Sequence, residues 1–177
     1  MTTKVLLVDL DGTIRQTASG KTFINEPQDQ KRIEGVQEVI EHLSQQFVII
    51  GVTNQGGVAA GHKSLASAIE EQRITLDLFP QISEIFFCPN WGDSCYQVSR
   101  GNEPIEFSAP LSGDGTKISC RKPGYGMLLL ASRSLAEPED CIMIGDRQED
   151  KDAADAYGTQ FFWASVLKNE QEWRNLK

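Results

Sequence analysis

The stretch Val5-Leu6-Leu7-Val8-Asp9-Leu10-Asp11-Gly12-Thr13 decides how this chain is interpreted. Its first four residues are all apolar, which is typical of a strand buried on both faces of a parallel sheet. Two carboxylates, Asp9 and Asp11, follow at once, and Gly12 lets the chain turn away. Carboxylates this close repel each other unless a cation lies nearby, so the pattern favours a metal site. An ordinary Asp-Gly turn after a strand would produce the same residues.

Strand-like and helix-like segments alternate along the rest of the chain. We expect strands at 4–9, 47–52, 84–87, 141–144 and 159–163, and helices at 36–46, 63–78, 125–135 and 150–157. This alternation predicts an α/β fold with a doubly wound, Rossmann-like parallel sheet and helices on both faces. Residues 1–177 are expected to form one domain, with a long loop at about 88–121 and no sustained periodicity there.

Three more polar clusters lie where the predicted strands end or a helix begins. Residues 53–57 (Thr-Asn-Gln-Gly-Gly) offer a hydroxyl, amides and exposed backbone N–H groups that suit phosphate oxygens. Residues 121–124 (Arg-Lys-Pro-Gly) offer a cation, and residues 145–150 (Gly-Asp-Arg-Gln-Glu-Asp) offer further carboxylates. Ligands bind at the carboxyl ends of strands in such sheets, so together the clusters predict a phosphate and metal site. Each cluster alone also suits an ordinary solvated loop.

The residue types suggest distinct roles in phosphate ester hydrolysis. Asp9 is the expected nucleophile, and Asp11 the expected acid and base, which requires a raised pKa for Asp11. Thr53 and Lys122 are expected to stabilise charge on the transferring group. The remaining expected roles are phosphate or substrate binding by Gly12, Thr13, Asn54, Gln55 and Arg121, Mg²⁺ binding by Asp9, Asp11 and Asp146, and secondary support by Asp150.

The four clusters resemble the four motifs of the haloacid dehalogenase (HAD) phosphatase superfamily. Asp9-x-Asp11-Gly12-Thr13 is similar to the first motif, Thr53-Asn54 to the second, Lys122 to the third, and Gly145-Asp146-x₃-Asp150 to the fourth. The resemblance spans about residues 5–162. It implies a Mg²⁺-dependent phosphoric monoester hydrolase with a minimal cap, which acts through an aspartyl-phosphate intermediate.

Finer features resemble one subgroup of that superfamily but leave the substrate open. Residues 53–57 resemble the Thr-Asn-Gln-x-Gly signature of heptose bisphosphate, histidinol phosphate and polynucleotide 3′-phosphatases. Residues 120–123 (Cys-Arg-Lys-Pro), followed by 126–128 (Gly-Met-Leu), are similar to the first two. Leu10 and the segment 19–23 are instead similar to the polynucleotide enzymes. We expect a small sugar phosphate, sugar bisphosphate or histidinol phosphate, with a nucleic-acid 3′-phosphate as the alternative. A non-catalytic binding protein on the same scaffold is a further alternative.

The subgroup often holds a structural zinc with Cys-x-His and Cys-x-Cys pairs. Here the histidine position carries Asn90 and one cysteine position carries Ile118. Cys88, Cys95 and Cys120 are the candidate zinc ligands that remain, with reduced thiols in a zinc-free loop as the alternative.

Composition restricts the protein class. The chain has 177 residues, 40% hydrophobic and 24% charged, as expected of a globular domain. A formal net charge of −8 disfavours a protein that grips many nucleic-acid phosphates. We find no signal peptide pattern and no apolar run long enough for a membrane span, so a cytoplasmic location is expected, with the oligomeric state left open.

Overall fold

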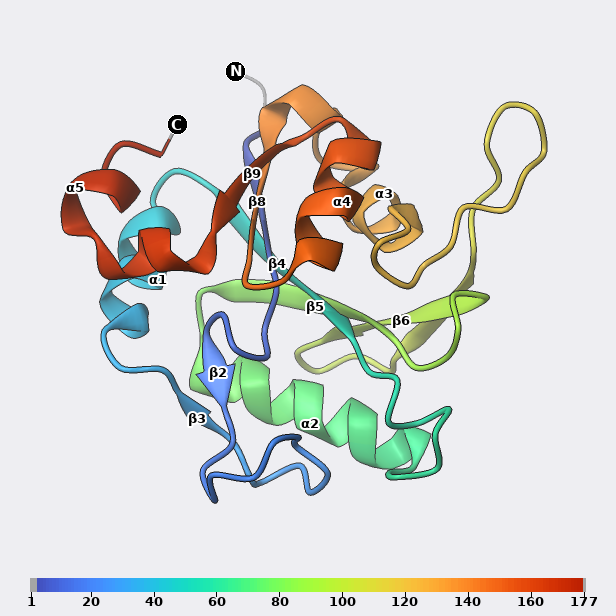
Figure 1. Ribbon diagram of the computed structural model, residues 1–177, viewed down its shortest axis with the longest axis horizontal. Helices are drawn as coiled ribbons and strands as arrows, with labels where there is room; N and C mark the ends of the chain where they lie inside the picture. Colours follow the sequence, from blue (N-terminus) through green and yellow to red (C-terminus); the bar gives the residue numbers. More distant parts are fainter. Residues whose placement is uncertain (1–2, 177) are drawn as a thin grey trace.

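The computed structural model describes residues 3–176, and its centre is a seven-stranded sheet (Figure 1). The strand order is β7-β6-β5-β4-β1-β8-β9. The strands are β1 (Val5–Val8), β4 (Val48–Asn54), β5 (Ile82–Cys88), β6 (Ser94–Ser99), β7 (Ile105–Ser108), β8 (Cys141–Gly145) and β9 (Gln160–Trp163). The five strands from β5 to β9 in this order are parallel, which confirms the expected doubly wound α/β fold. The predicted domain of residues 1–177 includes Met1, Thr2 and Lys177, which lie outside the described residues.

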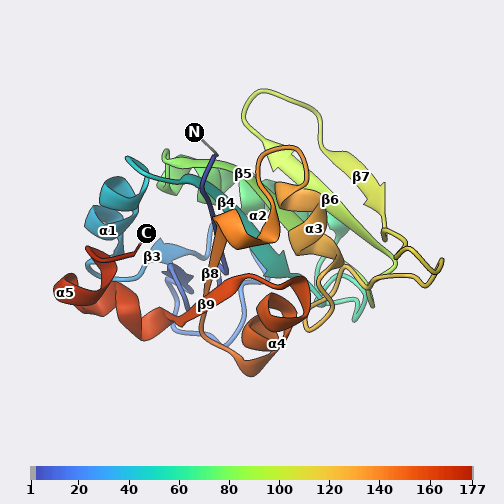
Figure 2. The ribbon, with the colours of Figure 1, turned by 90° about the horizontal axis from the view of Figure 1, so that it is seen from above.

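Helices cover both faces of the sheet (Figures 1 and 2). The first face carries α1 (Val36–Leu43), α2 (Leu65–Leu78) and the terminal helix α5 (Glu170–Trp173). The second face carries α3 (Gly126–Ser132) and α4 (Gln148–Tyr157). Two short 3₁₀ helices adjoin the last two strands of the chain. η1 (Pro138–Asp140) directly precedes strand β8, and η2 (Ala164–Lys168) directly follows strand β9.

Strand β1 shows why its run is continuously apolar. Successive side chains of a strand point to opposite faces. Leu6 and Val8 therefore pack in the core with α1 and α2, whereas Val5 and Leu7 pack in the core with α3 and α4. All four side chains are fully buried. The central strand thus joins two hydrophobic layers.

The segment 89–121 differs from the expected irregular loop, because it contains the two strands β6 and β7. Both are antiparallel to their neighbours and extend the sheet beyond β5, as Figure 2 shows. Cys95 and Val98 of β6 are buried, but the polar residues Ser94, Gln97 and Ser99 interrupt the strand, so the sequence shows no apolar run. The segment therefore lacks a strand-like apolar pattern although its backbone is extended at β6 and β7.

A second feature outside the expectations is the pair β2 (Arg15–Gln16) and β3 (Lys31–Arg32), which forms a separate two-stranded sheet. The chain between them, residues 17–30, lies beside the carboxyl edge of the main sheet and near α2 (Figure 1). None of the helices among residues 3–176 combines the length and apolar character that a bilayer crossing requires.

Candidate active site

Three neighbouring strands bring three of the polar clusters to one edge of the sheet. Strand β1 pairs with β4 on one side and β8 on the other, with Val8 opposite both Gly51 and Ile144. The backbone N–H of Asp9 donates to the carbonyl of Ile144 at 2.9 Å, which continues the ladder by one residue. Asp9 therefore lies between the ends of β4 and β8, at the carboxyl edge of the sheet.

The carboxylate of Asp9 is held by two donors. Lys122 Nζ lies 2.7 Å from Oδ1, and the Thr13 hydroxyl donates to Oδ2 at 3.1 Å. Asp9 is only 7% exposed, and this burial raises its pKa to about 7, an effect that Lys122 opposes and Asp150 adds to. The residue is thus fixed in orientation and opens onto a pocket.

Lys122 uses all three of its ammonium donors. Besides Asp9, its Nζ contacts the carbonyl of Val52 at 2.9 Å and Oδ1 of Asp150 at 2.6 Å. Burial alone would lower the pKa of Lys122, but the two carboxylates outweigh it and raise the pKa. A positive charge therefore lies between two buried carboxylates.

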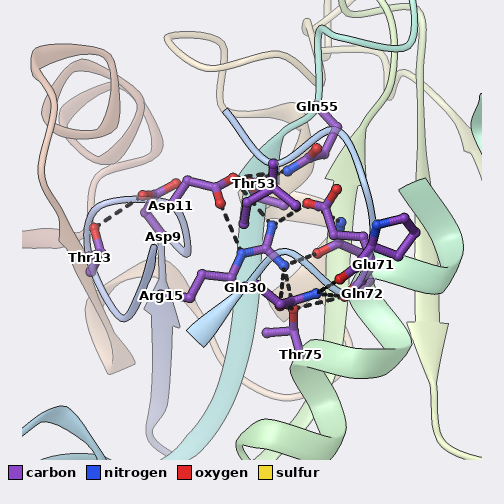
Figure 3. Close-up of polar contacts among 12 residues, drawn as sticks. Asp9, Asp11, Thr13, Arg15, Gln30, Thr53, Gln55, Glu71, Gln72 and Thr75 are labelled. Atoms are coloured by element: carbon purple, nitrogen blue, oxygen red, sulfur yellow. Dashed lines mark hydrogen bonds and ion pairs between the residues drawn. The ribbon is translucent and has the colours of Figure 1, made fainter. Parts of the chain in front are cut away.

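Asp11 turns away from Asp9 and toward Arg15 (Figure 3). Arg15 Nε donates to Oδ1 at 2.9 Å, while Gln55 Nε2 donates to Oδ2 at 3.0 Å and Thr53 Oγ1 lies 3.4 Å from Oδ2. Burial would raise the pKa of Asp11, but Arg15, Lys63 and Gln55 together outweigh burial and lower the pKa. The expected raised pKa is therefore wrong for this arrangement, because the sequence did not reveal the buried arginine beside Asp11.

A group of three carboxylates could hold a metal ion. Oxygens of Asp9, Asp146 and Asp150 all lie within 4.8 Å of one another, and Asp146 is the exposed member. Burial, followed by the nearby Asp150, raises the pKa of Asp146. Oxygen ligands of this kind suit Mg²⁺. The structure does not bring the Asp11 carboxylate into this group, although the sequence placed it among the metal ligands, and Asp150 takes part instead.

Glycine is required where these loops approach each other. A Cβ atom at Gly12, whose φ is +87°, would lie 2.4 Å from Oδ2 of Asp146. A Cβ atom at Gly145 would lie 2.5 Å from Oδ2 of Asp150. The two glycines therefore let the first and fourth clusters pack directly around the carboxylate group.

The amides expected to bind phosphate have other partners. Asn54 pairs with the backbone of Lys122, donating to its carbonyl and accepting from its N–H, both at 3.0 Å. Gln55 donates to Asp11 and accepts from Lys63 at 2.6 Å. Thr13 likewise binds Asp9. In this structure these side chains fasten the site together, and the backbone of Gly56 and Gly57 lines the pocket.

A pocket of about 1010 Å³ opens above Asp9. The wall opposite the sheet comes from residues 20–25. Among the described residues, Arg121 Nη1 is one of the few buried polar side-chain atoms without a hydrogen-bond partner, and its guanidinium lies over the Trp91 ring at 5.5 Å. The cationic side chains that line the pocket are Lys21, Lys31, Lys63, Arg121, Lys122 and Arg147. Five carboxylates line the same pocket: Asp9, Asp11, Asp146, Glu149 and Asp150. The pocket can therefore meet an anionic group with its cations and a metal ion with its carboxylates.

Sequence reasoning missed the polar residues behind Asp11. Arg15, Glu71, Gln72 and Thr75 are completely buried, and Figure 3 shows their contacts. Glu71, Gln72 and Thr75 are buried residues of α2, together with Ala68 and Leu76. The spacing of Ala68, Gln72 and Thr75, at i, i+4 and i+7, marks one helical face and was the available signal.

The three candidate zinc thiols pair with protein groups instead. Cys88 Sγ lies 3.4 Å from the Asn90 carbonyl, and burial raises the pKa of Cys88 to about 11. A hydrogen bond between Cys95 and Cys120 raises the pKa of the first and lowers that of the second. Among residues 3–176, the aspartate group described above is the set of side chains with metal-binding geometry. The structure therefore gives no support to the zinc expectation.

Comparison with known proteins agrees with this fold and site. A D,D-heptose 1,7-bisphosphate phosphatase from B. bronchiseptica, solved with magnesium and phosphate, matches with a TM-score of 0.63 and 22% identity over 89% of this chain and 78% of its own. A putative HAD-like phosphatase from Mesorhizobium loti matches with a TM-score of 0.67 and 20% identity over 89% and 70%. The chain therefore has the fold of the HAD-type phosphatases, which are phosphoric monoester hydrolases.

Sequence relationships narrow this class. A family model described as polynucleotide kinase 3 phosphatase matches residues 4–168, and the chain belongs to that family. The D-glycero-beta-D-manno-heptose-1,7-bisphosphate 7-phosphatase of Haemophilus influenzae is 28% identical over 83% of this chain and 73% of its own length. The enzyme of the same name from Haemophilus ducreyi is 27% identical over 89% and 80%. These relatives confirm the expected HAD subgroup.

Proposed function

We propose that this protein is a Mg²⁺-dependent phosphatase that hydrolyses a small phosphomonoester through an aspartyl-phosphate intermediate. The observation that carries the proposal is the buried Asp9 carboxylate, held by Lys122 and adjoining Asp146 and Asp150. A nucleophile, a fixed cation and a metal-binding group at one strand end are the components that phosphoryl transfer requires.

In the first step, a carboxylate oxygen of Asp9 attacks phosphorus. An Asp9–phosphorus bond forms, the ester bond from phosphorus to the leaving oxygen breaks, and Asp11 supplies the proton for that oxygen. The pKa of Asp11 is lowered in the free protein, and the negative charge of a bound phosphate would raise it, so that Asp11 can carry this proton. In the second step, Asp11 takes a proton from water, the water oxygen attacks phosphorus, and inorganic phosphate leaves Asp9. Lys122 stabilises charge on the transferring group throughout.

Asp9 and Asp146, with Asp150 as support, would hold the Mg²⁺ ion. When bound, the ion would neutralise charge on phosphate oxygens and on the carboxylates around it. The carboxylate geometry fits this cation, since hard oxygen ligands in small number are what Mg²⁺ prefers.

The leading substrate class is a sugar phosphate or sugar bisphosphate, with histidinol phosphate in the same size class. Two observations support it: the related heptose bisphosphate phosphatases, and the buried Nη1 of Arg121, which has no hydrogen-bond partner. The unpartnered Nη1 of Arg121 would be satisfied by another phosphate or carboxylate on the substrate. The chain's net charge of −8 also favours a small ligand over a long polyanion.

A second candidate, a polynucleotide 3′-phosphate, is favoured by the opposite wall of the pocket. Phe23 is 64% exposed there and lies near Lys21, an arrangement that suits stacking on a base beside a backbone phosphate. The matched family model, described as polynucleotide kinase 3 phosphatase, also favours a polynucleotide substrate.

Phosphate release from a mixed panel with Mg²⁺ tests both candidates. The panel contains sugar phosphates, a sugar bisphosphate, histidinol phosphate and a 3′-phosphorylated oligonucleotide, with Asp9→Asn beside the wild type. Preference for the first three supports the leading class, and preference for the oligonucleotide replaces it. If even an activated aryl phosphate releases no phosphate, the protein is a binding protein on this scaffold.

A further inference from the structure

Five side chains form a closed ring of polar contacts: Asp11, Arg15, Glu71, Lys63 and Gln55. Figure 3 labels four of them, Asp11, Arg15, Glu71 and Gln55. Arg15 bonds Asp11 on one side and Glu71 on the other, at 2.9 Å and 2.6 Å. Glu71 pairs with Lys63, which donates to Gln55 at 2.6 Å. Gln55 closes the ring by donating to Asp11 at 3.0 Å.

The ring is buried everywhere except at Asp11. The side chains of Arg15 and Glu71 are fully buried and that of Lys63 is 5% exposed, whereas that of Asp11 is 37% exposed and faces the pocket. The ring contains two cations and two carboxylates, so its formal charges cancel. Its single exposed member is the group proposed to exchange protons with substrate and water.

Further contacts leave Arg15 no freedom to rotate. Its Nη1 contacts Gln30, Gln72 and Thr75, so three sides of the guanidinium are engaged by α2 and by the segment before β3. Its Nη2 contacts the second oxygen of Asp11 at 3.2 Å. The planar fork of an arginine orients a carboxylate as well as pairing with it.

The opposite corner of the ring reaches the pocket wall. Lys63 Nζ donates to the carbonyl of Ile24 at 2.8 Å, and Ile24 belongs to the segment that faces the sheet across the pocket. The support of Asp11 and the support of this wall are therefore one connected network.

Burial of so many charged groups needs a reason other than stability. Replacing a buried ion pair by well-packed apolar residues is often neutral or stabilising, because desolvation offsets the attraction between the charges. Here one end of the buried pair binds a carboxylate at the candidate active site, which apolar residues could not do.

We propose that the ring centred on Arg15 is a positioning device, which holds the Asp11 carboxylate in the orientation needed for proton transfer to the leaving group. This inference rests on the proposed phosphatase function. Arg15 itself touches no reacting atom and acts through Asp11. Gln55 binds Asp11 directly, and Lys63 binds Gln55. Glu71 of α2 binds both Arg15 and Lys63.

The test measures kcat/KM with Mg²⁺ for three probes: dinitrophenyl, nitrophenyl and phenyl phosphate. These esters differ in how much the leaving oxygen needs a proton, so the slope of log kcat/KM against leaving-group pKa reports on Asp11. The variant is Arg15→Met/Glu71→Gln, which removes the fork without leaving Glu71 as an unpaired charge. Glu71→Gln alone is a milder second variant, used if the double variant does not fold.

The matched control is Arg100→Met. Arg100 binds the carbonyls of Leu76, Phe79 and Ile82, so this change loosens the same helix, α2, without a contact to Asp11. A purely structural effect should lower kcat/KM for all three probes by one common factor, in the Arg15 variant as in the Arg100 variant.

We expect kcat/KM of the double variant to fall about 10- to 100-fold for phenyl phosphate and less than about threefold for dinitrophenyl phosphate. Arg100→Met should give a line parallel to that of the wild type. Parallel lines for the Arg15 variants and an active wild type would overturn the positioning role alone. A wild type that hydrolyses none of the probes would overturn the proposed function, and the positioning role with it.

Discussion

Lys122 Nζ lies 2.7 Å from Oδ1 of Asp9, although 113 positions separate the two residues in the chain. The same nitrogen lies 2.6 Å from Asp150, so one buried cation serves two carboxylates. The Lys122 side chain therefore balances the charge of both carboxylates. Its backbone is held in place by Asn54, which accepts a hydrogen bond from the Lys122 N–H.

We expect Lys122→Met to unfold more easily by about 3–5 kcal/mol at pH 8, because two buried carboxylates lose their partner. Phosphatase activity should fall with it. The loss of stability should shrink toward acidic pH, where those carboxylates can become neutral. Urea unfolding at several pH values measures this. Lys151→Met, which breaks the exposed pair with Asp155, is the control and should change stability by less than about 1 kcal/mol.

Asp9→Asn should separate activity from stability. Turnover should fall by roughly 10³-fold or more, because the amide is no nucleophile. The folded state should be as stable as the wild type or more so at pH 8, since burial already disfavours the ionised carboxylate. Thermal unfolding and phosphate release on the same preparation check both halves. A strongly destabilised but active variant would contradict this assignment.

Mg²⁺ affinity should depend on pH through Asp9. Its pKa is about 7 in the metal-free protein, and a metal binds the ionised form. We expect the affinity to fall about tenfold per pH unit below pH 7 and to level off above it. Since this folded-state pKa lies above that of an unfolded aspartate, Asp9 makes the metal-free protein less stable as pH rises from about 4 to 7. Calorimetric titration across this range measures the affinity, and a flat profile would contradict the prediction.

Gly12→Ala should weaken Mg²⁺ binding and turnover, because the added methyl would lie 2.4 Å from an oxygen of Asp146. Gly35→Ala is a matched control, since Gly35 has a similar φ of +80° and open space around it. Both variants should lose about 1 kcal/mol or more of stability from backbone strain. Only Gly12→Ala should lose metal affinity, measured by the same titration. Equal metal affinity in the two variants would show that strain alone matters.

The sequence predicted the parts of the site that follow strong local patterns. Apolar runs located β1, β4 and β8, and the polar residues after them had to lie at one edge once the sheet was parallel. The placement of Asp9 and Asp146 followed from this rule, whereas Lys122 lies shortly before helix α3 and not at the end of a strand. The roles assigned to these residues stay predictions, which the experiments above test.

The remaining features depend on tertiary contacts that no local pattern encodes. Arg15 and Glu71 are charged, and charged residues are usually exposed, so their burial could not be read from periodicity. The lowered pKa of Asp11 follows from that burial. Strand β6 was missed for a related reason, because its neighbours β5 and β7 stabilise a sequence that alternates weakly.

The order of strands in the sheet has a consequence during synthesis of the chain. Asp9 is made early, whereas Lys122 and Asp146 are made more than a hundred residues later, and all three meet only when β8 joins the sheet beside β1. A partly made or partly folded chain therefore carries the proposed nucleophile, Asp9, without Lys122 and without the complete group of carboxylates proposed to hold the metal. Hydrolytic competence thus arrives last, as a property of the finished fold, and incomplete molecules lack the assembled catalytic centre.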